Sequence, residues 1–207
     1  MEATFNGKRM LDALSKLQPH QQLVFGAACC ERMLANYETF MREAGWGDVE
    51  PLRRALDRVW EACEGRRSPE AGLRDLLSQC EKCAPDAEDF TSLYVSSAQD
   101  AALAVCALLD FLLDGDLDRL VSVPRLSTDS VDLIVQEREN MDPRDPLRER
   151  KILGHPLMQQ DLVRQKRDVS EAAGISLGDK VAVLGFRSRA QHESNLVVGT
   201  RERPLRG

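Results

Sequence analysis

The strongest constraint on the fold is a run of apolar residues between Leu23 and Ala44. Their spacing alternates between four and three residues: Leu23, Ala27, Cys30, Leu34, Tyr37, Met41 and Ala44. This spacing keeps all of them on one face of an α-helix. Pro19 is suited to the first helical position, and Gly45 to the left-handed cap that ends a helix. The sequence therefore predicts one long helix over 19–45, packed along a single face.

The same period predicts helices along most of the chain. They cover about 6–18, 48–65, 68–85, 96–114 and 116–123, followed by a helix capped by Ser127 or Thr128. A proline disfavours helix in the residue before it, so Pro124 predicts a break and the Asp-Pro pairs of 140–146 predict a loop. A further long helix opens at Pro156 and ends before Gly174. Its expected inward residues are Met158, Leu162, Val169 and Ala173.

Residues 177–186 are ambiguous on local grounds, because β-branched residues and flanking glycines favour a strand. No other convincing strand is available to pair with them, so we expect a helix. The alternative is a short hairpin with residues 195–198.

The segment 96–114 is apolar on nearly all sides, with Asp100 and Asp110 as exceptions. Its most apolar part, 101–113, is too short to span a bilayer, so it belongs to a core. A chain of 207 residues can bury about 70% of its unfolded surface in one domain. We predict an all-α, single-domain, multi-helix bundle over 1–198 around this central helix, with a flexible tail over 199–207.

The charge is divided unevenly along the chain. Residues 1–143 carry 15 basic and 26 acidic side chains, hence −11, whereas residues 144–207 carry 13 and 8, hence +5. The total of −6 argues against a general nucleic-acid binder, which needs a basic excess to release counterions. We expect the basic part to pack across the acidic body, or to pair with it in a dimer.

The start of the chain lacks the apolar run and small-residue cleavage site of a signal peptide. Six cysteines without an export signal are typical of a reducing cytoplasm, where thiols stay free. We therefore expect a cytoplasmic protein without a membrane anchor.

No sequence pattern predicts catalysis or a cofactor. Nucleophile elbow, phosphate loop, dinucleotide fingerprint and Glu-x-x-His motifs are all missing. Cys80 and Cys83 form only one of the two pairs that a zinc site usually needs, and His20, His155 and His192 are scattered. We interpret the cysteines as packed core thiols and expect no metal, no cofactor and no catalytic residue.

Three carboxylates, those of Asp86, Glu88 and Asp89, could hold a divalent cation. The preferred interpretation is that they lie at the head of the 96–114 helix, whose dipole favours negative charge.

The remaining candidates for a ligand or partner site are Glu31, Arg32, Asn36, Tyr37, Trp46 and Asp48. Glu31 lies at the border of the buried helix face, where a carboxylate needs a partner. Arg32 points about 100° away from it, so the two do not pair. These residues could instead have purely structural roles. Asn36 and Tyr37 would then form hydrogen bonds with nearby backbone, Trp46 would pack inside the turn, and Asp48 would cap the next helix.

Several motifs resemble the bacterial YjaG-like family, catalogued as domain of unknown function 416. They are CCERMLANYETFMREAGWGD at 29–48, DRVWEA at 57–62, PDAEDF at 85–90 and HESN at 192–195, in order over about 8–198. The resemblance implies an all-α fold and a helix over 177–192. It supplies no catalytic residue.

Three classes of function remain. The preferred class is a non-enzymatic helical interaction or regulatory protein, a homodimer or one that binds another protein. The second is a small-molecule binder or enzyme using the polar residues of 31–48. The third is nucleic-acid binding through the basic C-terminal helices.

Overall fold

The computed structural model describes residues 4–194 and residue 196, and within this part the chain forms helices and no strand. The helices are α1 (Gly7–Leu14), α2 (Pro19–Ala44), α3 (Glu50–Cys63), α4 (Glu70–Glu81), the 3-10 turn η1 (Ala87–Asp89), α5 (Val95–Asp114), α6 (Leu117–Arg138), α7 (Arg148–Gly154), α8 (Pro156–Ala172) and α9 (Lys180–His192). The predicted all-α bundle is confirmed.

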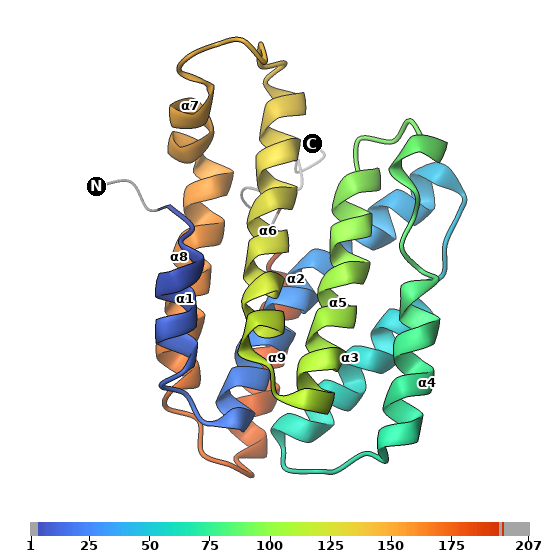
Figure 1. Ribbon diagram of the computed structural model, residues 1–207, viewed down its shortest axis with the longest axis vertical. Coiled ribbons are helices and arrows are strands. Elements are labelled where there is room, and N and C mark those ends of the chain that lie inside the picture. Colours follow the sequence, from blue (N-terminus) through green and yellow to red (C-terminus); the bar gives the residue numbers. More distant parts are fainter. Residues whose placement is uncertain (1–3, 195, 197–207) are drawn as a thin grey trace, which may run out of the picture.

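Two helices, α2 and α5, share the centre of the molecule. Figure 1 shows α5 between α6 on one side and α4 on the other, with α2 and α3 behind it. The predicted core helix 96–114 is therefore present. Its buried residues pack with those of α2, while Leu103 on the opposite face stays 44% exposed. α5 is also long and apolar enough to cross a membrane, but 61% of its apolar window is buried by its neighbours, as in a core helix.

The predicted ends of α2 are confirmed. Pro19 occupies its first turn, and Gln18 and Gln21 form a reciprocal capping box there. Gly45 ends the helix with φ +63°, the left-handed conformation for which glycine carries no steric penalty. In mid-helix, a Cβ at Gly26 would lie 2.6 Å from Leu108 and 2.7 Å from Leu120. Glycine at this position thus allows α2, α5 and α6 to approach closely.

The prediction of a break at Pro124 is wrong, because α6 runs without interruption from Leu117 to Arg138. Proline removes one backbone donor from a helix, but it does not prevent helical dihedrals on either side. The carbonyl that loses its donor is the one four residues before the proline, and the ring of Pro124 is itself buried. The carbonyl of Pro124 accepts from Thr128 Oγ1 of the same helix at 3.1 Å and from Gln165 Nε2 of α8 at 3.0 Å. The second of these bonds joins α6 to α8 at this point. The predicted loop over 140–146 is present.

The segment after residue 177 is helical, as we expected, and forms α9. Asp179 Oδ1 accepts from the backbone amide of Ala182 and so caps its first turn. In the alternative hairpin, most of the partner segment 195–198 lies outside the described residues, as does the predicted tail over 199–207.

The buried apolar side chains form two clusters. The larger joins α1–α5 with the first half of α6, the end of α8 and α9. The smaller joins the second half of α6 with α7, the start of α8 and Leu196. In Figure 1 the α6–α8 part rises above the rest of the bundle on the left, with α7 near the top.

Candidate functional site

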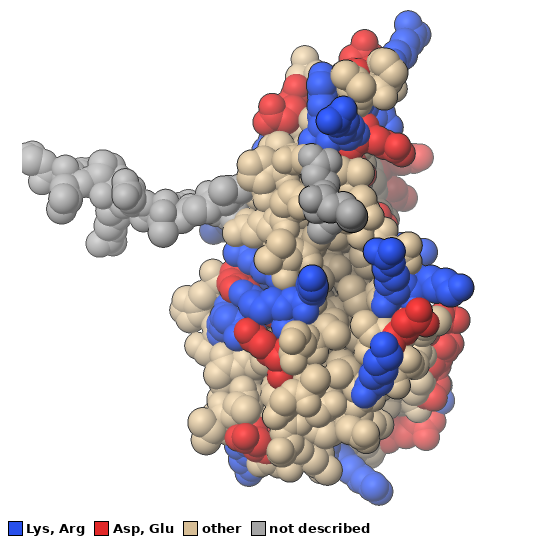
Figure 2. Space-filling model, turned by 90° about the vertical axis from the view of Figure 1, so that its left-hand side faces the viewer, with Lys and Arg blue, Asp and Glu red and all other residues tan. Residues whose placement is uncertain are grey.

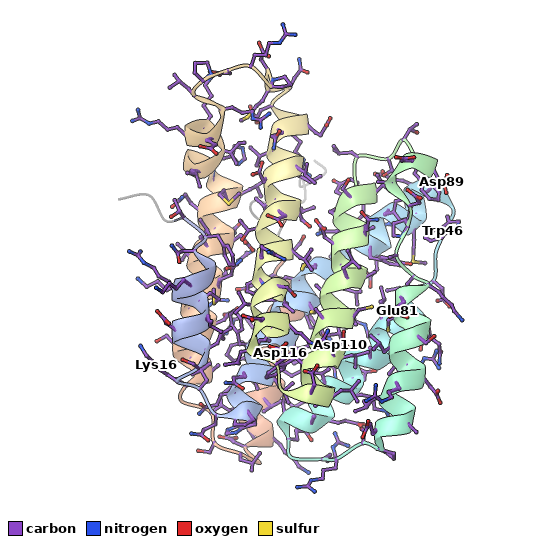
Figure 3. All side chains as sticks on the ribbon, in the orientation of Figure 1. Lys16, Trp46, Glu81, Asp89, Asp110 and Asp116 are labelled. Carbon is purple, nitrogen blue, oxygen red and sulfur yellow. The ribbon has the colours of Figure 1, made fainter. Side chains whose placement is uncertain are left out.

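The six candidate residues on and after α2 do not converge on one cavity. Glu31 and Arg32 lie in the buried middle of the helix, whereas Trp46 and Asp48 lie beyond its end. Figure 3 shows Trp46 and Asp89 at the right-hand edge of the molecule. The structure therefore divides the predicted site into a buried charged part and a surface turn.

Glu31 is fully buried, not at a border as the sequence predicted, because α9 covers that face of α2. Its Oε1 accepts from Trp60 Nε1 at 2.9 Å, and its Oε2 accepts from Arg53 at 2.5 Å. Arg187 and Gln191 of α9 reach the same carboxylate at 3.5 and 3.4 Å. A buried carboxylate needs such partners, so Glu31 ties α3 and α9 to α2.

Arg32 points to a different side of α2 from Glu31 and, as predicted, does not pair with it. Its Nη1 lies 2.6 Å from Asp168 Oδ2 on α8, and both side chains are buried. The other oxygen, Asp168 Oδ1, accepts from Arg167 at 2.9 Å and from Arg189 at 3.3 Å. A bidentate contact joins Arg167 to Glu193. This network fastens the C-terminal helices onto α2.

Another buried carboxylate of α8, Asp161, was missed from the sequence, as was Asp168. It accepts from Ser127 at 2.8 Å, Thr128 at 3.2 Å and Gln165 at 2.7 Å. Burial raises the pKa of Asp161, and these hydrogen bonds together with the nearby charge of Arg32 oppose the rise.

The missed residues had a signal in the sequence. Asp161, Gln165, Asp168 and Ala172 follow the 4,3,4 spacing of a helix face. A search for apolar residues alone overlooks the three polar members of this face and assigns Ala173 to the interior. Ala173 is exposed, whereas Ala172 faces inward.

The residues around the α2–α3 turn fulfil the structural roles considered for them. Tyr37 donates its hydroxyl to the carbonyl of Cys83 at 2.8 Å, and Asp48 Oδ1 accepts from the amide of Glu50, the first residue of α3. Trp46 packs against Phe40 and Phe90, with ring centroids 6.0 and 5.3 Å away. Asn36 is buried on α2.

The six cysteines are buried free thiols. Burial raises the pKa of Cys29 and of Cys106 to about 12, so neither is a thiolate at neutral pH. Cys80 lies in the last turn of α4, and Cys83 lies just beyond the helix with only 5% exposure. No group of three metal-ligating side chains lies within the described part of the chain. These features do not favour thiol catalysis.

Asp86, Glu88 and Asp89 lie in and beside η1, which precedes α5 in the sequence and contacts it. Asp86 Oδ1 accepts from the amide of Glu88. The interpretation of these carboxylates as charges at the head of α5 stays a prediction.

The basic C-terminal part contacts the acidic body mainly through Arg187, which pairs with Asp57 and Glu31. Arg164, Arg167 and Arg189 contact acids of their own part of the chain. Figure 2 shows basic and acidic side chains side by side across the face of α1 and α8. That face shows no continuous basic patch of the kind that binds nucleic acid.

The surface has two neighbouring grooves on the side of α3 and α4. The first, of about 710 Å³, is called the α3–α4 groove and is lined by Arg54, Asp57, Arg58, Glu61, Arg66, Arg67, Ser68, Pro69, Gly72, Leu73, Leu76 and Gln79. The second, of about 660 Å³, is called the Leu177 groove and is lined by Gln18, Pro19, His20, Leu23, Ala62, Gly65, Arg66, Arg67, Ser68, Leu73, Leu112 and Leu177. Neither contains any of the six candidate residues.

Beside the Leu177 groove stands an apolar ridge, which we define as Leu177, Val181 and Leu184. These side chains are 65%, 81% and 57% exposed. The spacing of three residues places Val181 and Leu184 on one face of α9, and Leu177 lies in the turn just before the helix. The ridge is close to α3, since a Cβ on Gly65 would lie 3.6 Å from Leu177.

Comparisons with known proteins agree with the fold and leave the chemistry open. The family model described as "Protein of unknown function (DUF416)" matches residues 9–199. "Uncharacterized protein YjaG" of Escherichia coli K12 is 33% identical over 122 residues, which cover 58% of this chain and 62% of that protein. An uncharacterized protein of Haemophilus influenzae is 27% identical over 132 residues, covering 62% and 66%. The match thus spans less than two thirds of either relative.

A crystal structure of a DUF416 family protein from Shewanella baltica superposes with a TM-score of 0.80 at 23% identity, covering 92% of this chain and 98% of that one. This likeness shows the shared fold. The matching family has no established biochemical function, so no catalytic residue can be carried over.

Proposed function

We propose, for a chain that belongs to the DUF416 family of proteins of unknown function, that it is a non-enzymatic helical interaction protein that forms a homodimer through the apolar ridge. The observation that carries the proposal is the ridge itself. Val181 is the most exposed large hydrophobic side chain in the described part of the chain, Leu184 shares its face of α9, and Leu177 is exposed in the turn before the helix. Contiguous exposed apolar surface of this kind marks interaction sites.

The neighbouring groove supports a second copy of the chain as the occupant. A twofold dimer uses the same patch on both subunits, so the patch needs a protrusion and a matching hollow. The ridge provides the protrusion. The Leu177 groove provides the hollow, with Leu23, Leu73 and Leu112 among its lining residues. In such a dimer the ridge of each subunit would occupy the groove of the other.

Light scattering during gel filtration tests this arrangement. At tens of micromolar we expect twice the chain mass of 23.2 kDa. The double variant Val181→Asp/Leu184→Asp should be monomeric, because burying two carboxylates in an apolar contact is strongly unfavourable. Both positions are exposed, so the fold of the monomer should tolerate the change.

A matched control adds the same two charges elsewhere. Leu133→Asp/Val163→Asp alters exposed apolar residues of α6 and α8, at 44% and 59% exposure, and should leave the dimer intact. A wild-type protein that stays monomeric at these concentrations would refute the homodimer. Loss of the dimer in the control but not in the ridge variant would move the interface to α6 and α8.

We further propose that the protein acts in the bacterial cytoplasm. Six buried thiols without a disulfide suit a reducing compartment. The two alternative functions have less support. Glu31 and Arg32 are committed to buried ion pairs, and several C-terminal arginines are already paired with acids.

A further inference from the structure

We infer that the α3–α4 groove binds a small organic phosphate. This groove shares Arg66, Arg67, Ser68 and Leu73 with the Leu177 groove, but the inference rests on its arginines and not on the apolar ridge. Its volume of about 710 Å³ falls within the range of roughly 300–1,000 Å³ typical of small-molecule sites. The groove is therefore large enough for a phosphate that carries an organic group.

The residues that line the groove carry a net positive charge, although residues 1–143, to which they belong, carry a net negative charge. Four arginines line it against Asp57 and Glu61, giving +2, although residues 1–143 sum to −11. The two acids are already engaged: Asp57 pairs with Arg187, and Glu61 pairs with Arg58 at 2.8 Å and with Arg66 at 3.6 Å. The basic excess is consequently not cancelled within the groove.

Two arginines provide that excess. Arg67 and Arg54 have no ion pair within residues 4–194 and 196, and Arg54 Nη2 donates only to the neutral Gln79 Oε1, at 2.9 Å. This hydrogen bond links α3 to α4 across the groove. An anion bound between the two helices could accept hydrogen bonds from these guanidinium groups without breaking an existing ion pair. Guanidinium groups bind phosphate through paired hydrogen bonds.

The remaining lining suits the organic part of the ligand. Leu73, Leu76 and Pro69 give the α4 side an apolar surface, and Ser68 adds a hydroxyl. Gly72 also lines the groove, and a Cβ there would meet no atom within 4 Å. A side chain at position 72 would therefore extend into open space without disturbing the packing of α4.

Nuclear magnetic resonance titration of the ¹⁵N-labelled chain tests the inference, with inorganic pyrophosphate, adenosine 5′-monophosphate and uncharged adenosine as probes at physiological salt. Adenosine 5′-monophosphate should bind saturably and shift the amides of residues 66–73. Pyrophosphate should bind more weakly at the same amides, and adenosine should not bind. In Arg54→Gln/Arg67→Gln, affinity should fall by roughly tenfold to a hundredfold, the effect of losing charge-assisted hydrogen bonds.

Two further variants keep the result interpretable. Arg144→Gln/Arg150→Gln removes the same charge from the 140–146 loop and α7, so it should bind normally. Gly72→Phe fills the groove and should abolish binding without lowering the unfolding temperature, whereas Gly72→Ala should retain it. Non-saturable shifts, shifts confined to residues that do not line the groove, or equal binding by Arg54→Gln/Arg67→Gln would each overturn the inference. Absence of binding by both phosphate probes at 10 mM, a concentration at which even roughly millimolar affinity is visible, would do the same.

Discussion

At the scale of single residues, the notable feature is that Glu31 and Arg32 are adjacent, both buried, and directed to different sides of α2. Glu31 anchors α3 and α9, and Arg32 anchors α8. The sequence predicted that they would not pair, since neighbours on a helix diverge by about 100°. Their partners could not be predicted, because Asp168 and Arg187 lie more than a hundred residues away along the chain.

Removing Arg32 alone should be costly. Arg32→Met leaves Asp168 buried with only Arg167 and Arg189, both of which are partly exposed, so we expect a loss of about 3 kcal/mol in the free energy of unfolding. Arg32→Met/Asp168→Leu removes both charges and should lose less than the single variant. Urea denaturation measures both. The single variant Asp168→Leu completes the comparison. If the loss in the double variant equals the sum of the losses in the two single variants, the two residues are not coupled in the way the structure implies.

Asp100 should make stability depend on pH. Burial raises its pKa to about 6, with a smaller contribution from Asp129, while a hydrogen bond from Ser130 opposes the rise. The folded state thus holds this proton more tightly than the unfolded state, whose carboxyl has a pKa near 3.9. The stabilising contribution is complete below about pH 4 and is lost as the pH rises through about 6, by up to about 3 kcal/mol.

Asp100→Asn should remove this dependence. The amide oxygen can still accept from Ser130, so the variant should gain stability relative to wild type as the pH rises from 4 to 7. Thermal melts of both proteins across that range give the difference directly. Parallel curves for the two proteins would show that Asp100 titrates normally.

At the scale of helices, the sequence predicted which segments are helical better than it predicted whether a helix is interrupted or which of its residues face inward. The ends of α2 followed from Pro19 and Gly45, and α5 from its apolar run. The predicted interruption at Pro124 was wrong because a proline only disfavours helix locally, and the buried packing of Pro124 within α6 overrides that preference. The prediction of the inward face of α8 was incomplete, because the buried residues of this helix include two carboxylates.

Pro124→Ala tests the continuity of α6. Proline in a helix interior is about 3 kcal/mol less favourable than alanine, and part of that is offset here by the loss of the buried ring. We expect a net gain of about 1 kcal/mol in unfolding free energy. A clear loss would mean that the ring packs as a necessary part of the core.

The two cysteines at the end of α4 should behave as packing groups. Cys80→Ala/Cys83→Ala should lose about 1–3 kcal/mol in total, as small buried groups do, without a change of fold. The purified wild type should contain no stoichiometric zinc, and a strong chelator should leave its melting temperature unchanged. One equivalent of zinc, or a drop of many degrees with chelator, would show a structural metal site instead.

At the scale of the whole molecule, the uneven charge of the chain accounts for part of its architecture. Arg187 crosses from the basic C-terminal part to Asp57 and Glu31 of the acidic body, as the sequence suggested, but the other basic residues of α8 and α9 are paired nearer by. The ridge and the α3–α4 groove were not predicted. The ridge lies in the segment 177–186, whose local pattern is ambiguous between strand and helix, and the α3–α4 groove depends on how two consecutive helices pack.

The central claim is that α9 carries the surface through which two copies associate. Hydrogen exchange of peptides covering residues 176–186, measured at about 1 µM and about 100 µM protein, tests it most directly, because association is governed by mass action. We predict slower exchange at the higher concentration for these residues, with no change around Val163 on α8, which is exposed in the monomer. Equal exchange rates for residues 176–186 at both concentrations, together with a monomeric mass, would contradict the account.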